Sequence, residues 1–389
     1  MKYRTLNDFK FSKKKVLVRV DFNVPLNEKG NITDDKKIRA ALPTIKYLLK
    51  QNAMVILMSH LGRPKRKYVK NLSMDRMAGR LQKLLKKKVY KAEMGIGPNE
   101  KYFKPGQVIL LENIRFYPEE KKNDTKFAKA LAAMADYYVN DAFGTCHRSH
   151  ASVDAVTRYL PSCAGLLVEK EIKVMGSALK KPKKPFTAII GGVKISSKID
   201  TIKNLLKKAD YLLIGGAMMF TFLKAGGLNV DKSLVENDKL SLAKKLMKNR
   251  KIVLPVDCVI GNKFDKNAKA KTVYVNKIKG IGLDIGPKTA KLYSAIIKKS
   301  KTVLWSGPMG KFEWTKFSKG TKQIAKAMVK SKGLTIVGGG DTVAALEKFR
   351  LEKKISHVST GGGASLEFFG GKTLPAIAAL EKNKKKFKK

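Results

Sequence analysis

The sequence has few acidic residues, few cysteines and no long apolar run. Its three cysteines, Cys146, Cys163 and Cys258, form no CxxC pair, so a dense disulfide framework is excluded and free thiols in a reducing compartment are expected. No run approaches the roughly 20 apolar residues of a membrane span, and the N-terminal MKYRTLNDFKFSKKK lacks the apolar core of an export signal. We therefore expect a cytoplasmic protein with no membrane partner.

The shortage of acidic residues gives the chain an unusual charge. It has 82 Lys and Arg against 31 Asp and Glu, a formal net charge of +51. Such an excess is typical of proteins that bind polyanions, but here the lysines are spread between apolar segments, and only the tail Glu381–Lys389 is a dense basic block. We attribute the high charge to a lysine-biased proteome or to a surface altered by design, two origins that the sequence does not distinguish. We expect nucleic acid to bind only non-specifically.

The first half of the chain alternates strand-like and helix-like segments. Continuously apolar runs are typical of strands covered on both faces, and apolar residues spaced three and four apart are typical of helices. Such βα alternation predicts an α/β fold with a parallel sheet. The predicted strands are Lys15–Val20, Met54–Met58, Val108–Leu111 and Tyr137–Val139, and the predicted helices are Lys37–Lys50 and Met74–Lys87.

The 389 residues are too many for one typical domain, and a boundary is visible near the middle. Gly165–Lys180 predicts one long helix, and the charged segment Lys180–Pro185 with its two prolines ends it. The alternation resumes at Phe186–Ile190. We predict two doubly wound, Rossmann-like parallel-sheet domains joined by a helix and hinge: residues 1–170, a helix end and linker at 171–185, residues 186–372, and a C-terminal segment at 373–389.

Strands of the second half end in glycines. The clearest case is Thr335–Thr342, where an apolar run ends in Gly338, Gly339 and Gly340 and is followed by Asp341 and Thr342. Glycines let main-chain N–H groups approach a phosphate closely, and a following helix N-terminus favours negative charge. Asp341 is suited to hold the Mg²⁺ of a nucleotide. The other glycine-rich ends are at residues 188–192, 212–216, 303–307 and 357–363.

Strands of the first half end instead in charged and polar groups, at residues 19–23, 59–64, 112–116 and 140–148. If these strands are parallel, their carboxyl ends meet at one edge of the sheet. Arg63, Arg115, Arg148 and His60 would then form a cluster suited to a multiply charged anion, because the planar guanidinium binds phosphate and carboxylate through two hydrogen bonds. An arginine taken alone is more often a surface ion-pair partner, but four such strand ends favour a site.

A series of motifs runs in order from about Arg4 to Leu380: RVDFNVP, SHLGRP, LLENIRFYPEE, NDAFG, CHRSHAS, the IIGG–K–xxx–K run, LDIGP, GPMG with FEW, VGGGDT and STGGGASLE. Together they resemble the phosphoglycerate kinase family. The resemblance implies transfer of a phosphoryl group between 1,3-bisphosphoglycerate and ADP, giving 3-phosphoglycerate and MgATP. It also implies a monomer whose two domains each bind one substrate and close about a hinge, with the C-terminal segment returning to the first domain.

The resemblance assigns 3-phosphoglycerate to the first domain and the nucleotide to the second. It implies that Asp21 and Asn23 contact the hydroxyl and carboxyl end of the acid, and that Lys37 contacts the transferring phosphoryl group. The anionic groups of the acid would be held by His60, Arg63, Arg115 and Arg148.

For the second domain, the resemblance places Lys198 on the nucleotide phosphates and Lys194 on the transferring group. These two lysines lie four apart, so on a helix they would share one face. The same resemblance implies that Glu313 accepts hydrogen bonds from the ribose hydroxyls and that Asp341 binds the Mg²⁺. It also implies that the amides of Gly361, Gly362 and Gly363 stabilise the charge that develops during transfer. The other implied nucleotide-binding residues are Gly216 and Gly282 at adenine and Gly339, Gly340 and Thr342 near the phosphates.

The sequence departs from the family pattern at several positions. Lys37 stands where an arginine is usual, so the charge is kept but the planar fork is lost. The other departures are Val193, Ala217, Ser306 and Lys311. They motivate an alternative hypothesis, a catalytically impaired or engineered protein of this fold that binds polyanions such as nucleic acid. Turnover distinguishes the two hypotheses, whereas salt-sensitive binding to a polyanion is expected of both.

Overall fold

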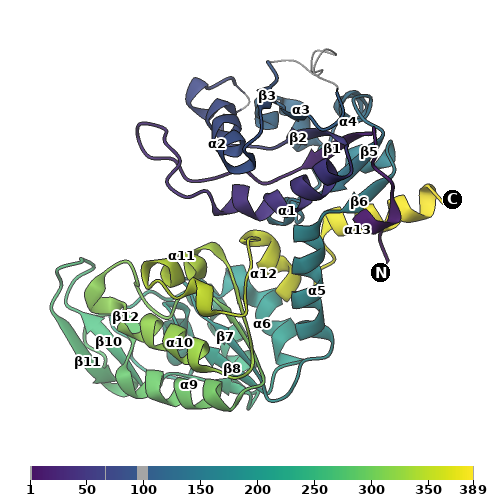
Figure 1. Cartoon of the computed structure of the whole chain (residues 1–389). Coiled ribbons are helices and arrows are strands. Elements are labelled where there is room, and N and C mark those ends of the chain that lie inside the picture. Colours follow the sequence, from purple (N-terminus) through teal and green to yellow (C-terminus); the bar gives the residue numbers. More distant parts are fainter. Residues whose placement is uncertain (1, 66, 94–103, 389) are drawn as a thin grey trace. The chain divides into compact units, whose positions relative to one another are not determined.

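The computed structural model describes residues 2–65, 67–93 and 104–388, and it divides into two compact units (Figure 1). The first unit comprises Met1–Lys173 together with Thr373–Lys389, and the second comprises Val174–Lys372. The division falls within the helix α5 (Leu166–Lys180), so this helix begins in one unit and ends in the other. The proline-containing segment 181–185 therefore belongs to the second unit.

The first unit is built on a six-stranded parallel sheet in the order β3-β4-β2-β1-β5-β6. Val16, Leu17, Val18 and the strand β2 are buried, as expected for strands covered on both faces. The strands are β1 (Lys15–Arg19), β2 (Met54–Met58), β3 (Val89–Lys91), β4 (Val108–Leu110), β5 (Tyr137–Asn140) and β6 (Ser162–Ala164), and the helices besides α5 are α1 (Lys36–Lys50), α2 (Asp75–Leu85), α3 (Pro118–Lys122), α4 (Thr125–Ala132) and α13 (Pro375–Lys386).

The C-terminal helix α13 packs on the first unit, although it follows the whole second unit in sequence. Figure 1 shows α13 beside β6, and the two elements are in contact. The buried side chain of Asn383 fixes this position: its Oδ1 accepts the Ser162 N–H at 2.9 Å, and its Nδ2 donates to the carbonyls of Thr157 and Leu160.

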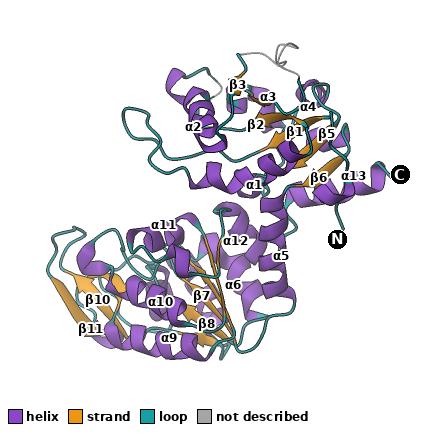
Figure 2. Cartoon of the chain, in the orientation of Figure 1, coloured by secondary structure: helices purple, strands orange, loops and turns teal. Residues whose placement is uncertain are grey.

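The second unit contains another six-stranded parallel sheet, in the order β15-β14-β13-β7-β8-β9. Figure 2 shows its strands lying among helices. The predicted fold class, two doubly wound parallel sheets, is thus confirmed. The strands are β7 (Phe186–Ile190), β8 (Tyr211–Ile214), β9 (Ile252–Val253), β13 (Thr302–Ser306), β14 (Leu334–Gly338) and β15 (His357–Val358), and the helices are α6 (Ile199–Leu206), α7 (Met218–Ala225), α8 (Leu240–Met247), α9 (Pro287–Lys299), α10 (Lys319–Lys330), α11 (Gly340–Lys348) and α12 (Gly363–Phe369).

A three-stranded antiparallel sheet in the second unit was not predicted. Its strands are β10 (Asp257–Gly261), β11 (Ala270–Tyr274) and β12 (Ile281–Ile285), in the order β11-β10-β12. Every residue of β11 is exposed or only partly buried, so this strand lacks the continuous apolar run that identified the parallel strands. An antiparallel strand with a solvated face carries a weaker sequence signal.

Candidate active site

Both parallel sheets have a point where the strand order reverses, and ligands of doubly wound folds bind at such points. In the first sheet β1 has β2 on one side and β5 on the other, so the reversal lies between β1 and β5. In the second sheet it lies between β7 and β13. Polar strand ends follow β1 and β5, and glycine-rich strand ends follow β7 and β13. The remaining polar and glycine-rich ends follow β2, β4, β8, β14 and β15.

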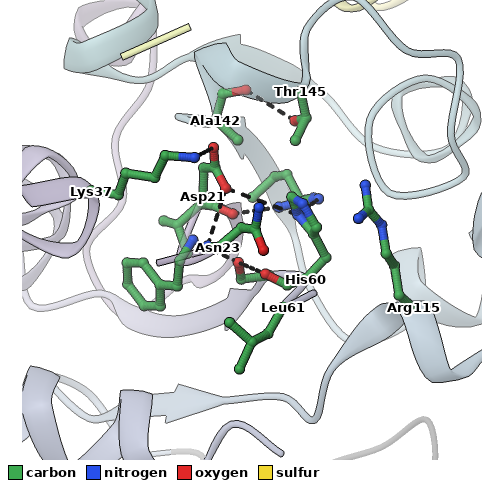
Figure 3. A network of polar contacts seen from close by, with 12 residues as sticks. Asp21, Asn23, Lys37, His60, Leu61, Arg115, Ala142 and Thr145 are labelled. Atoms are coloured by element: carbon green, nitrogen blue, oxygen red, sulfur yellow. Dashed lines mark hydrogen bonds and ion pairs between the residues drawn. The ribbon is translucent and has the colours of Figure 1, made fainter. Parts of the chain in front are cut away.

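At the first reversal point, Asp21 connects two basic groups (Figure 3). The Lys37 Nζ, at the start of α1, lies 2.9 Å from Asp21 Oδ2. The His60 Nδ1, after β2, lies 4.0 Å from Asp21 Oδ1. Asn23 contacts the loop after β2 that carries His60, because its Oδ1 accepts the Gly62 N–H at 2.8 Å. The predicted residues Asp21, Asn23, Lys37 and His60 therefore lie together.

The imidazole of His60 is held in one protonation state. Burial lowers the pKa of His60 well below 6.5, and the charges of Arg19, Arg115, Lys37 and Arg148 lower it further. The Arg19 Nη2 lies 3.2 Å from His60 Nδ1. Because a guanidinium only donates, Nδ1 must accept, and the single proton of the neutral ring sits on Nε2. His60 therefore offers a neutral N–H donor.

Arg19 itself is positioned by a buried network that sequence reasoning missed. Its Nε donates to Ser152 Oγ at 2.9 Å, and Ser152 Oγ donates to Glu120 Oε1 at 2.7 Å. Glu120 also accepts the Ser152 N–H and faces His150 Nδ1 at 3.5 Å. Arg19 ends β1 within a quoted motif, but nothing in the sequence pairs it with a serine 133 residues away.

Arg115 lies beside this cluster with hydrogen-bonding capacity to spare. Its Nη1 donates to the Gly62 carbonyl at 2.8 Å, whereas its buried Nε and Nη2 have no partner among the described residues. Burial lowers the pKa of Arg115 to about 10, and the charges of Arg148 and Arg19 contribute. Burial likewise lowers the pKa of Arg148, with Arg63 and Arg19 adding to the effect. This excess of positive charge favours an anionic ligand.

At the second reversal point, glycine backbones pack closely around Lys198. A Cβ on Gly307 would lie 2.2 Å from the Gly191 carbonyl oxygen, so no side chain fits there. The Lys198 Nζ lies 3.2 Å from the carbonyl oxygen and 3.4 Å from the Oγ of Ser306. Burial lowers the pKa of Lys198 to about 8, while the Asp341 carboxylate acts in the opposite direction. A bound polyphosphate would favour the charged form of this lysine.

The expectation that Lys194 and Lys198 share a helix face is wrong. Lys194 precedes the 3-10 turn η7 (Ser196–Lys198), and α6 starts only at Ile199. Lys194 is exposed, whereas Lys198 is 9% exposed and turned toward Ser306. The spacing of four is uninformative here because the segment is not α-helical.

The glycine run after β14 opens α11 as expected. Gly339 has φ +93° and precedes the helix, whose first turn contains Gly340, Asp341 and Thr342. The Asp341 carboxylate is exposed, while Thr342 is buried and its Oγ1 accepts the Gly307 N–H at 2.6 Å. Thr342 thus fixes the loop after β13. Asp341 offers a hard oxygen ligand of the kind that Mg²⁺ prefers.

The remaining predicted nucleotide residues also lie in the second unit. Gly216, with φ +64°, would carry its Cβ 2.3 Å from the Gly192 N, and a Cβ on Gly282 would overlap the Phe220 ring. Glu313 is exposed, and its Oε1 lies 3.2 Å from the Lys311 Nζ. Gly361 and Gly362 precede α12, which begins at Gly363.

Comparison with known proteins identifies the family. The family model for phosphoglycerate kinase matches residues 6–372. The chain belongs to the phosphoglycerate kinase family. The phosphoglycerate kinase of Moorella thermoacetica is 52% identical over 387 residues, covering 97% of this chain and 98% of that protein. That of Nostoc sp. is 54% identical over 385 residues, covering 95% of this chain and 96% of that protein.

Two solved structures of the phosphoglycerate kinase family have the same fold. The structure from Coxiella burnetii has a TM-score of 0.89 and 40% identity, with coverage of 98% of this chain and 99% of that one. The structure from Pyrococcus horikoshii OT3 has a TM-score of 0.85 and 32% identity, with coverage of 98% and 100%. These proteins are phosphotransferases, and the chain shares their family and architecture.

Within the described residues, no helix has the length and apolarity needed to cross a bilayer. Among the same residues, no group of three or more His, Cys, Asp and Glu side chains is arranged to hold a metal ion. A metal at Asp341 would therefore take most of its ligands from elsewhere, as Mg²⁺ does when it is held by one or two carboxylates and substrate phosphates.

Proposed function

We propose that the chain catalyses reversible phosphoryl transfer between 1,3-bisphosphoglycerate and ADP, giving 3-phosphoglycerate and MgATP in glycolysis or gluconeogenesis. The observation that carries this proposal is the basic cluster at the β1–β5 reversal point. There, a neutral His60 donor lies among the charges of Arg19, Arg115 and Arg148, and two buried nitrogens of Arg115 have no partner in the part of the chain that the structure describes. In a chain of this family, such a cluster suits a small acid with two anionic groups.

In this proposal, the first unit binds the acid. His60 Nε2–H, Arg63, Arg115 and Arg148 hold its carboxylate and phosphate, while Asp21 and Asn23 contact its hydroxyl and carboxyl end. Lys37 supplies positive charge to the transferring phosphoryl group. The Asp21–Lys37 pair, at 2.9 Å, holds the lysine in place before substrate arrives.

The second unit would bind the nucleotide. Gly216 and Gly282 would line the adenine pocket, Glu313 would accept the ribose hydroxyls, and Lys198 with the amides of Gly339 and Gly340 would hold phosphates. The exposed carboxylate of Asp341 would hold the Mg²⁺ of the nucleotide, and Thr342 would keep the adjoining loop in place. When bound, the cation neutralises phosphate charge.

The chemistry requires no general base. In the ATP-consuming direction the nucleophile is a carboxylate, which is already ionised at neutral pH. Catalysis then consists of positioning and of stabilising charge on the moving phosphoryl group. Lys37, Lys194 and the amides of Gly361, Gly362 and Gly363 would provide that stabilisation. Because the two substrate sites belong to different units, transfer requires that the units bring them together and exclude water.

The polyanion-binding alternative gains no support from the comparisons, which all name phosphoglycerate kinases. We retain it only as an outcome of the assay. A cytoplasmic location fits the three free, buried cysteines. The monomeric state remains a prediction.

The decisive experiment is a coupled assay of ATP-dependent 3-phosphoglycerate phosphorylation with Mg²⁺. Turnover of roughly 1–100 per second or more is expected. Absence of turnover, despite nucleotide binding measured by calorimetry, would overturn the proposal. Arg115→Ala should raise the KM for 3-phosphoglycerate about tenfold or more, because a charge-assisted contact is lost. Arg158→Ala, which removes an exposed arginine paired with Asp154 at 3.6 Å, is the matched control and should leave KM unchanged.

A further inference from the structure

The helix α5 lacks a local cap at its N-terminus. The first N–H groups of a helix have no partner within the helix, and the residue before α5 is Gly165, which has no side chain to supply one. Two distant side chains take this role: Thr44 Oγ1 accepts the Leu166 N–H at 2.9 Å, and Asp141 Oδ1 accepts the Leu167 N–H at 2.8 Å. The Thr44 hydroxyl also acts to lower the pKa of Asp141.

These two capping residues lie close in sequence to residues of the acid-binding cluster, the name used here for Asp21, Asn23, Lys37, His60, Arg63, Arg115 and Arg148. Asp141 follows β5, and its own N–H donates to the Arg19 carbonyl at 2.8 Å. Thr44 lies on α1, seven residues after Lys37, and two helical turns place both on similar faces of α1. Displacement of α1 or of the β5 loop would therefore move the cap of α5.

The cap is tightly packed and closed to solvent. A Cβ at Gly165 would lie 2.3 Å from Asp141 Oδ1, so the glycine makes room for the carboxyl. Asp141 and Thr44 are both completely buried, and Asp141 Oδ2 has no hydrogen-bond partner among the described residues. A buried carboxylate with one bare oxygen is costly to keep charged.

We propose that Asp141 and Thr44 are positioning residues for catalysis. They hold the first turn of α5 against α1 and the loop after β5, so that a movement of these two elements also moves α5. Because α5 continues from the first unit into the second, it is the described helix through which such a signal can run between the units. The inference rests on the proposed function. Neither residue contacts substrate in this proposal.

The contact of Thr44 and Asp141 with the first turn of α5, called the joint below, should depend on pH because Asp141 can ionise. Burial raises the pKa of Asp141 to about 7, although Thr44 and the amides of Leu167 and Val168 act to lower it. The ionisable groups around it are the buried thiols of Cys146, in the loop after β5, and Cys163, on β6. The facing groups of α1 and α5 are the Thr44 hydroxyl and main-chain amides. Protonation near neutral pH would weaken the cap, because a helix N-terminus prefers an anion.

The effect of Asp141→Asn on the free energy of unfolding distinguishes a positioning role from a structural one. A carboxyl whose pKa is raised contributes stability fully below about pH 4, and that contribution is lost as the pH rises through 7. Asp141→Asn carries no charge at any pH, so at pH 8 it should be at least as stable as the wild-type protein. Its kcat should nevertheless fall about fivefold, which corresponds to about 1 kcal/mol, because the neutral amide lacks the negative charge that a helix N-terminus prefers.

Kinetic tests use Asp141→Asn, Thr44→Val and Thr44→Ser. We expect the wild-type kcat to fall below about pH 7 and this limb to be absent in Asp141→Asn, with both KM values within about twofold. Thr44→Val should lower kcat, and Thr44→Ser should restore it because the hydroxyl returns. Asp124→Asn is the matched control, since Asp124 caps a different helix, α4, by accepting the Phe127 N–H at 2.8 Å.

Hydrogen exchange tests the joint without relying on activity. Fraying of the first turn of α5 that leaves Asp141 buried should be easier when its carboxyl is protonated, because the cap hydrogen bonds favour the anion. In the substrate-free wild-type protein, the amides at the start of α5 should therefore exchange faster at pH 6 than at pH 8 after correction for intrinsic rates. In Asp141→Asn this difference should vanish. Equal corrected exchange at both pH values, or an Asp141→Asn variant with wild-type kcat, would overturn the inference. A wild-type chain without turnover but with pH-dependent exchange would overturn the proposed function and leave the joint itself standing.

Discussion

Lys37 is the residue at which this chain departs most clearly from the family pattern. Its Nζ lies 2.9 Å from Asp21 Oδ2, so its charge reaches the predicted substrate cluster. An ammonium offers a point charge where a guanidinium offers a planar fork with two parallel donors. We predict that Lys37→Arg raises kcat several-fold, measured in the coupled assay at saturating substrates.

The neighbouring Lys36 is the control for this substitution. Lys36 is half-exposed, and its Nζ lies 3.9 Å from Asp34 Oδ2, so Lys36→Arg should leave kcat unchanged. Arg39 does not replace Lys37 in this arrangement, because it pairs with Asp35 at 2.8 Å. An unchanged or lower rate in Lys37→Arg would show that the lysine is no handicap.

His60 should make the stability of the protein depend on pH. Its pKa is held well below 6.5 by burial and by Arg19, so the folded chain does not take up this proton between pH 7 and pH 5. The unfolded chain does, and the free energy of unfolding therefore falls as the pH is lowered. We predict that urea titrations show a loss between pH 7 and pH 5 about 1–2 kcal/mol larger in the wild type than in His60→Gln. Equal losses in the two proteins would mean that His60 is protonated in the folded state.

The sequence predicted which polar residues lie together after the strands of the first unit better than it predicted how they are held. Asp21, His60 and Arg115 follow buried strands, and parallel strands bring their carboxyl ends to one edge whatever the loops do. The support of Arg19 by Ser152 and Glu120 depends on contacts between distant segments, for which a single sequence carries no signal. The buried cap of α5 escaped prediction for the same reason.

At the scale of elements, segments with one dominant signal were predicted best. The predicted strands at Met54–Met58 and Phe186–Ile190 match β2 and β7 exactly in extent, because both are completely buried. The helix expected at Met74–Lys87 ends earlier, at Leu85, where Lys86 turns to φ +53°. The β10–β12 sheet was missed because its outer strand β11 is largely exposed.

The docking of α13 depends on Asn383. Its side chain satisfies three main-chain groups, on Thr157, Leu160 and Ser162, and it is buried. Asn383→Ala would leave these groups without partners, each at a cost of about 1–3 kcal/mol where water cannot reach. We predict a loss of about 2–4 kcal/mol in the free energy of unfolding of the first unit, measured by urea titration. Lys385→Ala, on the exposed face of α13, should change it by less than about 0.5 kcal/mol, and equal effects would refute a specific role for Asn383.

At the scale of the whole molecule, the formal net charge of +51 opposes the compact state. The lysines are spread along the chain, so the cost is a general self-repulsion of the kind that a high net charge imposes. Salt shortens the range of this repulsion, since the Debye length is about 10 Å at 0.1 M and about 30 Å at 0.01 M. A chain with balanced charges would gain little from such screening.

We therefore predict that the Tm rises by several degrees between 20 and 300 mM NaCl, measured by calorimetry without substrates. The acid-binding cluster offers a competing cause, because an anion bound at Arg115 and Arg148 would stabilise the folded chain by mass action. Sodium sulfate at equal ionic strength separates the two causes. General screening gives similar shifts with both salts, whereas a shift confined to sulfate would assign the stabilisation to the anion site and reject self-repulsion as the dominant effect of the charge.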